Sequence, residues 1–589
     1  MDKFNSLYVD CLYKNYSTTP EIYELGIDLV LQSNDFRVQE DLIYKLLNLY
    51  PNDYKLYYFM GSIHRNQSTD KSLFWFKKCY SINPQYIENV LDLTKTLFEN
   101  DNYEEVNRIC KMLKNPTDRR ILLLMGTSYI KSGHYNDAVK VLEKTITGQN
   151  DNTDCYALQN MGILKNDLNL CEDAIKYLKK AYSIATDPNN KQKFLGNILI
   201  TSDYIYFDSL EKHKLITQIN DMYTNHKYFG EHHRRLSSHL NIGYVSSDFS
   251  THAVANFILP ILENHDTQRF QIFLYSTKQY VSPQFSKLGF PIKNIYNVSS
   301  VEAAKMIYED KIDILFDLNG HTDGSRLDVF ALNPAPVQIT YMGYPNTTGL
   351  KSMHYRLTDN ISDHPESKQI YSEKLVYLPS FFLIFKSIIQ NTPIIPRKTN
   401  KTVYLGSLNK ENKSSPDVLG VWKEIMKINK NTKIIIKTNG LIDRTEFYKK
   451  TLDVQADRLI LLDKSLSNEQ YIALFSKIDI LLDTFPYSGT TTTCNALYNS
   501  IPVITLYNKD YHSHNVSSSI LTRCGFPELV TYTFQEYVDK TTTLIKNTTQ
   551  IDRYKTTIGE SFNKYMNASQ FMRSYEETLE NLYNERLPI

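Results

Sequence analysis

The sequence predicts an α + α/β chain, in which an N-terminal helical superhelix precedes two doubly wound α/β domains. A helical pattern repeats with an offset of 36 residues, strands and helices alternate from about residue 240, and a polar, proline-containing stretch at 391–401 interrupts that alternation. At 589 residues the chain exceeds what one hydrophobic core usually fills. We place the boundaries at 1–225, 226–395, 396–545 and 546–589, and expect the last segment to form helices that pack on the core.

The repeat is clearest where segment 122–145 is aligned with segment 158–181. The alignment superimposes small and apolar residues: Gly126 on Gly162, Ala138 on Ala174, and Leu142 on Leu178. A small residue at a fixed distance after the glycine lets two antiparallel helices approach closely, which is the tetratricopeptide pattern. Roughly four to five such units would stack into a superhelix whose concave surface holds an extended peptide. By itself this region predicts polypeptide partners and a scaffold without catalysis.

From residue 240 onward, short β-rich runs alternate with helices. This order implies parallel sheets covered on both faces, with ligands at the carboxyl ends of the strands. The predicted strands are 240–245, 270–275, 313–318, 337–341, 402–405, 433–437, 459–462, 478–482 and 503–506. Because the series breaks at 391–401, we expect two such domains facing each other across a cleft.

Composition excludes several classes of function. Lys plus Arg is 66 and Asp plus Glu is 65, so the chain lacks the basic balance expected of a protein that binds nucleic acid or an anionic membrane. Its seven cysteines are scattered without metal-ligand or disulfide spacing, which fits a reducing compartment. No secretory leader or long apolar segment is evident, and we expect a cytoplasmic or nuclear protein.

The run LLDTFPYSGTTTTCNALYNSIPV at 481–503 predicts a strand, a tight turn and a helix. The first N–H groups of such a helix are unpaired and its dipole is positive there, so it suits a phosphate or diphosphate. The four threonines at 490–493 would add hydroxyl donors, whereas plain helix capping explains only one of them. Lys413 follows the strand at 402–405, where a lysine can neutralise a diphosphate; alone, it would be a solvated surface charge.

Other candidates follow strands of the first α/β domain. Asp248 and His252 come directly after its first strand, at the edge where such folds place their sites. His321 follows a later strand, where it can alternatively cap the next helix. The loop at 341–349 contains two glycines that let the backbone approach a ligand closely.

From residue 241 onward the sequence has no Asp-x-Asp pair, the usual way to hold a metal-bound nucleotide diphosphate. The diphosphate charge must then be met by the helix dipole, hydroxyls and a lysine. Two facing α/β domains with metal-free diphosphate binding specify a nucleotide-sugar glycosyltransferase of the two-domain, GT-B type.

At this point the sequence resembles the O-GlcNAc transferase family, most closely its SPINDLY branch. The matching motifs are GYVSSDFSTHAV, DLNGHT, NPAPVQITYMGYPNTTGL, TDNISDHPE, LDTFPYSGTTTTCNALYNSIPV and HSHNVSSSILTRCG. The segment from 377 to 404 is too short for the extra domain that animal members insert, which favours the SPINDLY branch. The resemblance implies an inverting, metal-independent transferase of a single sugar to Ser or Thr hydroxyls of polypeptides. GDP-fucose is slightly favoured over UDP-GlcNAc as the donor, and a homodimer is an open possibility.

The resemblance also assigns residue roles. It implies that His252, Lys413 and Asp248 are catalytic. It implies that donor binding uses Thr490, Thr491, Thr492, Gly489, Asn495, Tyr471, Met342, Gly343 and Lys410. It places His226 and His321 in acceptor or secondary positions.

Three residues depart from the family pattern. Tyr471 stands where animal members carry a histidine stacked on the base, and an aromatic ring can still stack there. Asn495 replaces an acidic residue expected to hold the ribose hydroxyls, which weakens those hydrogen bonds. Lys410 replaces a Gln or Asn and adds a charge. These departures leave open a second hypothesis, a peptide-binding scaffold with weak or lost transferase activity. A third, a transferase acting on metabolites, is disfavoured by the repeats.

Overall fold

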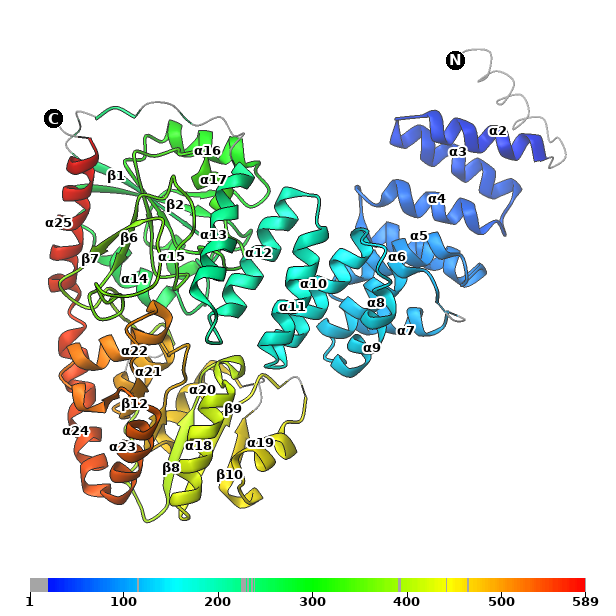
Figure 1. Cartoon of the computed structure of the whole chain (residues 1–589). Coiled ribbons are helices and arrows are strands. Elements are labelled where there is room, and N and C mark those ends of the chain that lie inside the picture. Colours follow the sequence, from blue (N-terminus) through cyan, green and yellow to red (C-terminus); the bar gives the residue numbers. More distant parts are fainter. Residues whose placement is uncertain are drawn as a thin grey trace. The chain divides into compact units, whose positions relative to one another are not determined.

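The computed structural model describes residues 20–113, 116–223, 229, 232–234, 237, 239–389, 393–440, 442–462 and 466–587. Its contacts divide the chain into two compact units, residues 1–161 and 162–589. The first unit is helical. The second contains the last helices of the helical region together with both parallel sheets (Figure 1).

Helices occupy the described residues from 20 to 223. They are Pro20–Gln32 (α2), Phe36–Leu49 (α3), Tyr54–His64 (α4), Thr69–Ile82 (α5), Ile87–Glu99 (α6), Tyr103–Lys111 (α7), Arg119–Lys131 (α8), Tyr135–Thr145 (α9), Asn152–Asp167 (α10), Cys171–Ile184 (α11), Pro188–Ser202 (α12) and Ser209–Tyr223 (α13). Side-chain caps at Asp35, Asp53 and Ser68 begin α3, α4 and α5.

The glycines of the repeat do what the sequence predicts. A Cβ on Gly126 would lie 2.7 Å from Leu142 Cδ2, and one on Gly162 would lie 2.6 Å from Leu178 Cγ. Both distances are shorter than real carbon contacts, so only glycine lets the second helix of each pair approach this closely. The predicted equivalence of the repeat segments 122–145 and 158–181 is therefore confirmed.

The first sheet has the strand order β3-β2-β1-β4-β5-β6-β7, with every neighbouring pair parallel. Its strands are Leu240–Ser246 (β1), Phe270–Ser276 (β2), Ile292–Asn294 (β3), Ile314–Asp317 (β4), Val337–Thr340 (β5), Tyr355–Thr358 (β6) and Lys374–Tyr377 (β7). Its helices are Ala255–Asn264 (α14), Pro283–Ser286 (α15), Ser300–Glu309 (α16) and Leu327–Ala331 (α17). The four strands predicted for this domain are confirmed, whereas β3, β6 and β7 were not predicted.

The second sheet repeats this plan with the order β10-β9-β8-β11-β12-β13, again parallel throughout. Its strands are Val403–Ser407 (β8), Thr432–Lys437 (β9), Leu459–Leu462 (β10), Ile480–Leu482 (β11), Val503–Leu506 (β12) and Val530–Thr531 (β13). Its helices are Pro416–Ile428 (α18), Thr445–Leu452 (α19), Asn468–Ala473 (α20), Thr491–Tyr498 (α21), His512–Arg523 (α22) and Phe534–Lys546 (α23). Short 3-10 turns lie at Glu411–Lys413 (η1), Ala456–Arg458 (η2), Leu474–Lys477 (η3) and Pro527–Leu529 (η4). The five predicted strands are confirmed, and β13 is additional.

Two C-terminal helices, Thr548–Tyr565 (α24) and Ala568–Arg586 (α25), connect the two sheets (Figure 1). Helix α24 packs on α21 and α23 of the second domain, and α25 returns to α14 and β5 of the first. The buried hydroxyls of Tyr244 and Tyr575 lie 3.1 Å apart, and His265 Nδ1 lies 3.0 Å from Glu576 Oε1. The C-terminal segment therefore packs on both α/β domains.

Helices α12 and α13 belong to the hydrophobic core of the first α/β domain. Leu195 and Leu199 of α12 and Ile219 of α13 are fully buried in one cluster with Leu332 and Leu350. This packing explains why the second compact unit begins before these helices rather than after them. Within the described residues, no helix has the length and apolar content needed to cross a membrane.

Candidate functional site

The second sheet reverses its strand order between β8 and β11, and ligands of such sheets bind outside the carboxyl ends of the strands at that point. Asp483, fully buried directly after β11, joins the two loops that follow these strands. It accepts hydrogen bonds from Asn409 Nδ2 at 3.1 Å and from the Gly489 N–H at 2.8 Å. Thr505 on β12 donates a third at 2.8 Å. Asp483 therefore fixes the turn that leads into α21.

The same device appears in the first sheet. Asp317 ends β4 and accepts from the Gly320 N–H, 2.9 Å away, and from Thr340 Oγ1 of β5, also 2.9 Å away. Burial raises the pKa of Asp317. In both domains, a buried carboxylate thus lies where the strand order reverses. It holds the loop at the carboxyl ends of the strands.

Helix α21 begins at Thr491, as the sequence predicts, with Thr490 as its N-cap. The Thr490 side chain makes no capping hydrogen bond, and no other described side chain accepts a hydrogen bond from the first N–H groups, which therefore suit an anionic ligand. The side chains of Thr490, Thr491 and Thr492 are half-buried, whereas Thr493 is buried with its Oγ1 2.7 Å from Ser517 Oγ. Three of the four threonines are therefore available at the helix start, and the fourth holds α22.

Lys413 ends the η1 turn and reaches over to the α21 loop. Its Nζ donates to the Ser488 carbonyl at 2.8 Å and lies 3.8 Å from the centre of the Tyr487 ring. Burial lowers the pKa of Lys413 to about 7; the Lys410 charge also lowers it and Asp483 opposes the shift. Among the described residues, no carboxylate forms an ion pair with Lys413. Its positive charge is thus left for a ligand beside the start of α21.

The η1 turn is held by its neighbours on both sides. The buried Glu411 accepts from Arg444 Nε at 3.0 Å and from the Asn439 N–H at 2.9 Å. Ser415, the N-cap of α18, donates to the Phe485 carbonyl at 2.8 Å. Lys410, in contrast, is exposed. Lys413 therefore lies on a turn that buried contacts hold in place. The exposed Lys410 adds a second positive charge close to it in the sequence.

Tyr471 on α20 lies close to the start of α21. Burial raises the pKa of Tyr471 to about 12, whereas the side chains of Thr492 and Asn495 act to lower it; Lys437 Nζ lies 5.2 Å from the centre of its ring. Asn495 is buried on α21. Two residues that depart from the family pattern, Tyr471 and Asn495, thus lie beside the start of α21, and base stacking by Tyr471 stays a prediction.

The candidate residues of the first domain form a separate network. Asn319 Nδ2 donates to Ser247 Oγ at 2.7 Å and to Asp248 Oδ2 at 3.3 Å. His252 Nδ1 lies 3.4 Å from Asp248 Oδ2, and 49% of its side chain is exposed. His252 is thus oriented by a buried network and remains accessible to a substrate. Among the described residues, no hydrogen bond or ion pair connects His252 or Asp248 with Lys413.

His321 has a different environment. Its Nε2 lies 2.9 Å from the Thr348 carbonyl oxygen rather than at a helix N-terminus, and burial lowers its pKa to about 4. Its backbone packs against Gly196 of α12, where a Cβ would lie 3.2 Å from the His321 oxygen. The ring is therefore buried between loops, and its expected secondary role stays a prediction. His226 lies outside the described residues.

Met342 and Gly343 form the tight loop after β5. Met342 has a positive φ of 52°, and a Cβ on Gly343 would overlap the Leu318 carbonyl. Only glycine fits at Gly343, because this loop crosses directly over the end of β4. The predicted close approach of the backbone is therefore present, and donor binding by these two residues stays a prediction.

Helix α22 joins the two α/β domains through polar side chains. His512 Nδ1 lies 2.7 Å from Asp363 Oδ2 in the loop after β6, and Ser519 donates to Asp359 at 2.8 Å. Ser517 of the same helix donates to the Gly489 carbonyl at 2.8 Å. The loop that leads into α21 is therefore connected to the first α/β domain through α22.

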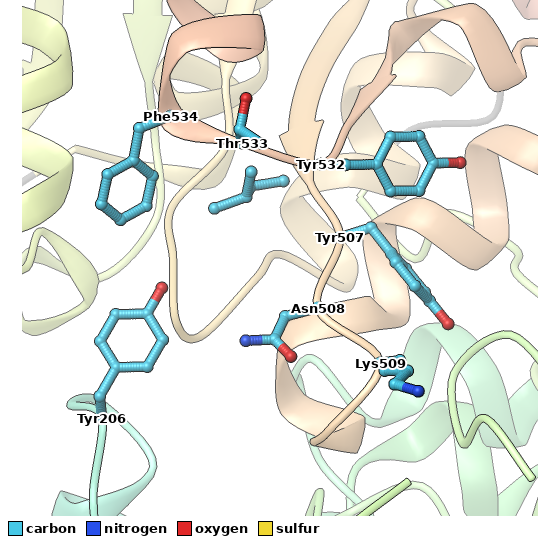
Figure 2. A pocket seen from close by; sticks show the side chains of 8 residues that line it. Tyr206, Tyr507, Asn508, Lys509, Tyr532, Thr533 and Phe534 are labelled. Atoms are coloured by element: carbon cyan, nitrogen blue, oxygen red, sulfur yellow. The ribbon is translucent and has the colours of Figure 1, made fainter. Parts of the chain in front are cut away.

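A hollow of about 530 Å³ lies at the carboxyl ends of β12 and β13. Figure 2 shows Tyr206 and Phe534 on one side of it and Tyr507 and Tyr532 on the other, with Asn508 between them. None of the residues predicted from the sequence lines this hollow. Among the described residues, no cluster of three or more His, Cys, Asp or Glu side chains is placed to hold a metal ion.

Sequence reasoning missed Asn409, Asp483 and Tyr487. Asp483 carries a usable signal, because an acidic residue directly after an apolar strand is unusual unless it binds the following loop. Asn409 and Tyr487 carry none, since their contacts come from loops brought together by the fold.

Similarity to known proteins identifies the family of this chain. The model of glycosyl transferase family 41 matches residues 210–390 and 386–575. The chain is 38% identical over 330 residues to the probable UDP-N-acetylglucosamine–peptide N-acetylglucosaminyltransferase SPINDLY of Arabidopsis thaliana, covering 54% of this chain and 36% of that protein. It is 31% identical over 226 residues to the UDP-N-acetylglucosamine–peptide N-acetylglucosaminyltransferase of Caenorhabditis elegans, covering 37% and 20% respectively. The chain thus spans little more than a third of the length of its plant relative.

A solved structure of a mutant O-GlcNAc transferase from Thermobaculum terrenum is similar, with a TM-score of 0.76 and 24% identity. The similarity covers 85% of this chain and 98% of that one. At this identity it speaks for the fold alone, and it confirms the predicted helical region followed by a GT-B type pair of domains. The family model covers more than half of the residues, and the chain belongs to glycosyl transferase family 41.

Proposed function

We propose that this protein transfers a single sugar from a nucleotide-sugar donor to serine or threonine hydroxyls of polypeptides, with inversion and without a metal. The observation that carries the proposal is the pairing of Lys413 with the uncapped start of α21 at the strand reversal of the second sheet. A buried ammonium without an acidic partner, next to free helix N–H groups, is complementary to a diphosphate. The relatives named above support a polypeptide acceptor.

In the proposed reaction, the acceptor hydroxyl attacks the anomeric carbon as the bond from that carbon to the diphosphate oxygen breaks. The hydroxyl proton passes to His252, which Asp248 orients, or to water, and the nucleoside diphosphate leaves with the bonding electron pair. Because a hydroxyl is a weak nucleophile at neutral pH, the rate depends on positioning and on stabilising the departing charge. Lys413, Thr490, Thr491 and Thr492 supply that stabilisation.

Among donors, we favour GDP-fucose slightly over UDP-GlcNAc. The resemblance to the SPINDLY branch supports fucose, whereas the printed names of the plant relatives specify N-acetylglucosamine. Tyr471 can stack on either base.

Calorimetry with GDP-fucose and UDP-GlcNAc tests the proposal, on wild type beside Lys413→Ala. We expect one donor to bind and Lys413→Ala to weaken its binding and abolish transfer to a polypeptide. A matched control is Lys427→Ala, which removes an exposed lysine that is ion-paired with Glu424 on α18. If neither donor binds wild type, the peptide-binding scaffold becomes the better hypothesis. If Lys413→Ala keeps normal turnover, the mechanism is wrong.

A further inference from the structure

Two tyrosine rings lie one behind the other next to Lys413. The ammonium lies 3.8 Å from the centre of the Tyr487 ring. That ring stacks on Tyr204, with centres 5.3 Å apart and 28° between the planes. Tyr487 belongs to the turn after β11, whereas Tyr204 lies in the connection between α12 and α13. A continuous contact therefore runs from the candidate phosphate site to the helices that precede the α/β domains.

The Tyr487 ring restricts where the Lys413 ammonium can lie. A lysine head on a flexible four-carbon stem has no fixed geometry of its own. Here the Ser488 carbonyl accepts one N–H bond, and the electron-rich ring face attracts the charge from a second side. These two contacts leave the remaining N–H for a ligand. The ring thus selects one position of the ammonium out of the many that the stem allows.

Tyr204 is itself held firmly. The residue is buried, with 7% of its surface exposed. One residue earlier, the buried Asp203 forms an ion pair with the buried Lys212 of α13 and accepts from Asn346 Nδ2 at 3.1 Å. The Tyr204 ring therefore belongs to a chain segment that buried polar contacts hold in place, and moving that segment would break them.

The helical segment also contacts η1 from another direction. Asn169, in the turn between α10 and α11, donates to the Ser414 carbonyl at 2.8 Å. Ser414, the residue after Lys413, is therefore contacted by a segment that precedes the α/β domains.

We propose that Tyr487 is a positioning residue for Lys413, and that Tyr204 keeps Tyr487 in place, so that the phosphate site depends on the connection between α12 and α13. The inference rests on the proposed function, because it takes Lys413 as the group that meets the diphosphate. It adds that the helical region supports the chemistry directly, besides any polypeptide that it binds.

The charges around this stack set its expected pH behaviour. Asp483 and Lys410 act on Lys413 in opposite senses, and Asp203 and Arg356 act on Tyr487. None of the variants below changes these groups. Because leucine keeps the site apolar, the main loss in Tyr487→Leu is the attraction of the ring for the ammonium, and we expect the pKa of Lys413 to fall further.

The test compares Tyr487→Phe, Tyr487→Leu, Tyr204→Phe and Tyr204→Leu with wild type. Donor binding is measured by calorimetry from pH 6 to 9 with GDP-fucose and UDP-GlcNAc, and transfer to a polypeptide is measured in parallel. The matched control is Tyr206→Leu, two residues further along the same connection, where the ring contacts His514 and lines the hollow of Figure 2.

For Tyr487→Leu we expect the pH midpoint of donor binding to fall by about 0.5 to 1 unit, as the loss of a cation–π contact implies. We expect kcat to fall roughly tenfold, because the ammonium is no longer held in the reactive geometry, with little change in KM for the acceptor. Tyr204→Leu should act in the same direction but less strongly. Both Phe variants, which keep the ring, and Tyr206→Leu should behave like wild type.

Thermal unfolding shows whether each variant is folded. If Tyr487→Leu is not folded, the comparison of Tyr204→Leu with Tyr204→Phe tests the inference instead. Folded Leu variants with the pH midpoint and kcat of wild type would overturn the inference. So would Phe variants that lose as much as the Leu variants, because the hydroxyl rather than the ring would then matter. Absence of donor binding by wild type would overturn the proposed function itself, and this inference with it.

Discussion

Lys413 Nζ donates a 2.8 Å hydrogen bond to the carbonyl oxygen of Ser488, one residue before the glycine that leads into α21. The lysine and the helix start therefore share a single loop, although 75 residues separate Lys413 from Ser488. We therefore expect a diphosphate bound at the helix start to lie close to the ammonium.

Donor binding should weaken above neutral pH. Burial lowers the pKa of Lys413 to about 7, so the free protein loses the charge above that pH. A bound diphosphate favours the charged form and raises the pKa again. Binding is thus independent of this group below pH 7, and its dissociation constant should rise up to about tenfold per pH unit above it.

Calorimetry in buffers of different ionisation enthalpy measures the accompanying proton uptake, which should approach one proton per donor at pH 8.5. A nucleotide sugar is the right probe, because its phosphate diesters do not titrate near neutrality. The Lys413→Met variant provides the control and should show no uptake. Equal uptake by that variant would assign the proton to another group.

Gly489→Ala should weaken donor binding while the fold is retained. A Cβ at Gly489 would lie 2.6 Å from Thr493 Oγ1 and 3.1 Å from Asp483 Oδ1, both within a buried network. The turn must then shift, and we expect a loss of about 1–3 kcal/mol in unfolding free energy, as overpacking usually costs. Binding should fall more than tenfold, as measured by calorimetry.

Gly420→Ala is the matched control. Gly420 lies on the exposed face of α18 with no neighbouring atom within 4 Å of an added Cβ. An alanine there should stabilise the helix by about 0.5–1 kcal/mol and leave donor binding unchanged. If both alanines affect binding equally, the crowding at Gly489 is not the cause.

The sequence predicted the elements around the candidate site of the second sheet, because they follow from local patterns. An apolar strand, a Pro and Gly turn, and a tract of threonines follow one another at 481–493, and the structure places β11, the turn and α21 there. The predicted place of Lys413 after a strand is likewise seen, since η1 follows β8. Local order is what single-sequence patterns record.

The contacts that join these pieces were not predictable. Tyr204 and Tyr487 are separated by 283 residues, and neither has a local pattern that differs from an ordinary aromatic residue. The missed strands β3, β6, β7 and β13 read IKN, YRLT, KLVY and VT, and none contains an apolar run such as ILFD in β4 or ILL in β11. Their place in the sheet comes from pairing with a neighbouring strand rather than from their own sequence.

Each threonine at the start of α21 should contribute to donor binding on its own. Valine has nearly the same shape but no hydroxyl, so Thr490→Val, Thr491→Val and Thr492→Val remove one donor each. A hydrogen bond to a charged group is worth about 1.5–3 kcal/mol, which corresponds to a loss of roughly tenfold or more in affinity. Thr557→Val, on the exposed face of α24, is the control and should bind as wild type does. Normal affinity in all three variants would mean that the phosphates bind elsewhere.

The buried pair of Asp363 and His512 should make stability depend on acid. Burial alone would raise the pKa of Asp363, but His512, Arg356 and Thr358 lower it to about 2. An unfolded aspartate titrates near 3.9, so the stabilisation is complete above about pH 4 and is lost as pH falls towards 2. Asp363→Asn leaves His512 without its charged partner, and we expect a loss of about 3–5 kcal/mol near neutral pH.

Urea unfolding of wild type and Asp363→Asn between pH 7 and 3 measures the difference in unfolding free energy, which should shrink as pH falls. Glu424→Gln, which removes an exposed pair with Lys427, is the control and should change stability by less than about 1 kcal/mol. Because Asp363 lies in the first α/β domain and His512 on α22 of the second, the variant also loosens the contact between them. Its donor affinity should therefore fall as well, since α22 holds the Gly489 carbonyl through Ser517. A difference that stays constant down to pH 3 would show that the pair does not carry the charge assigned to it.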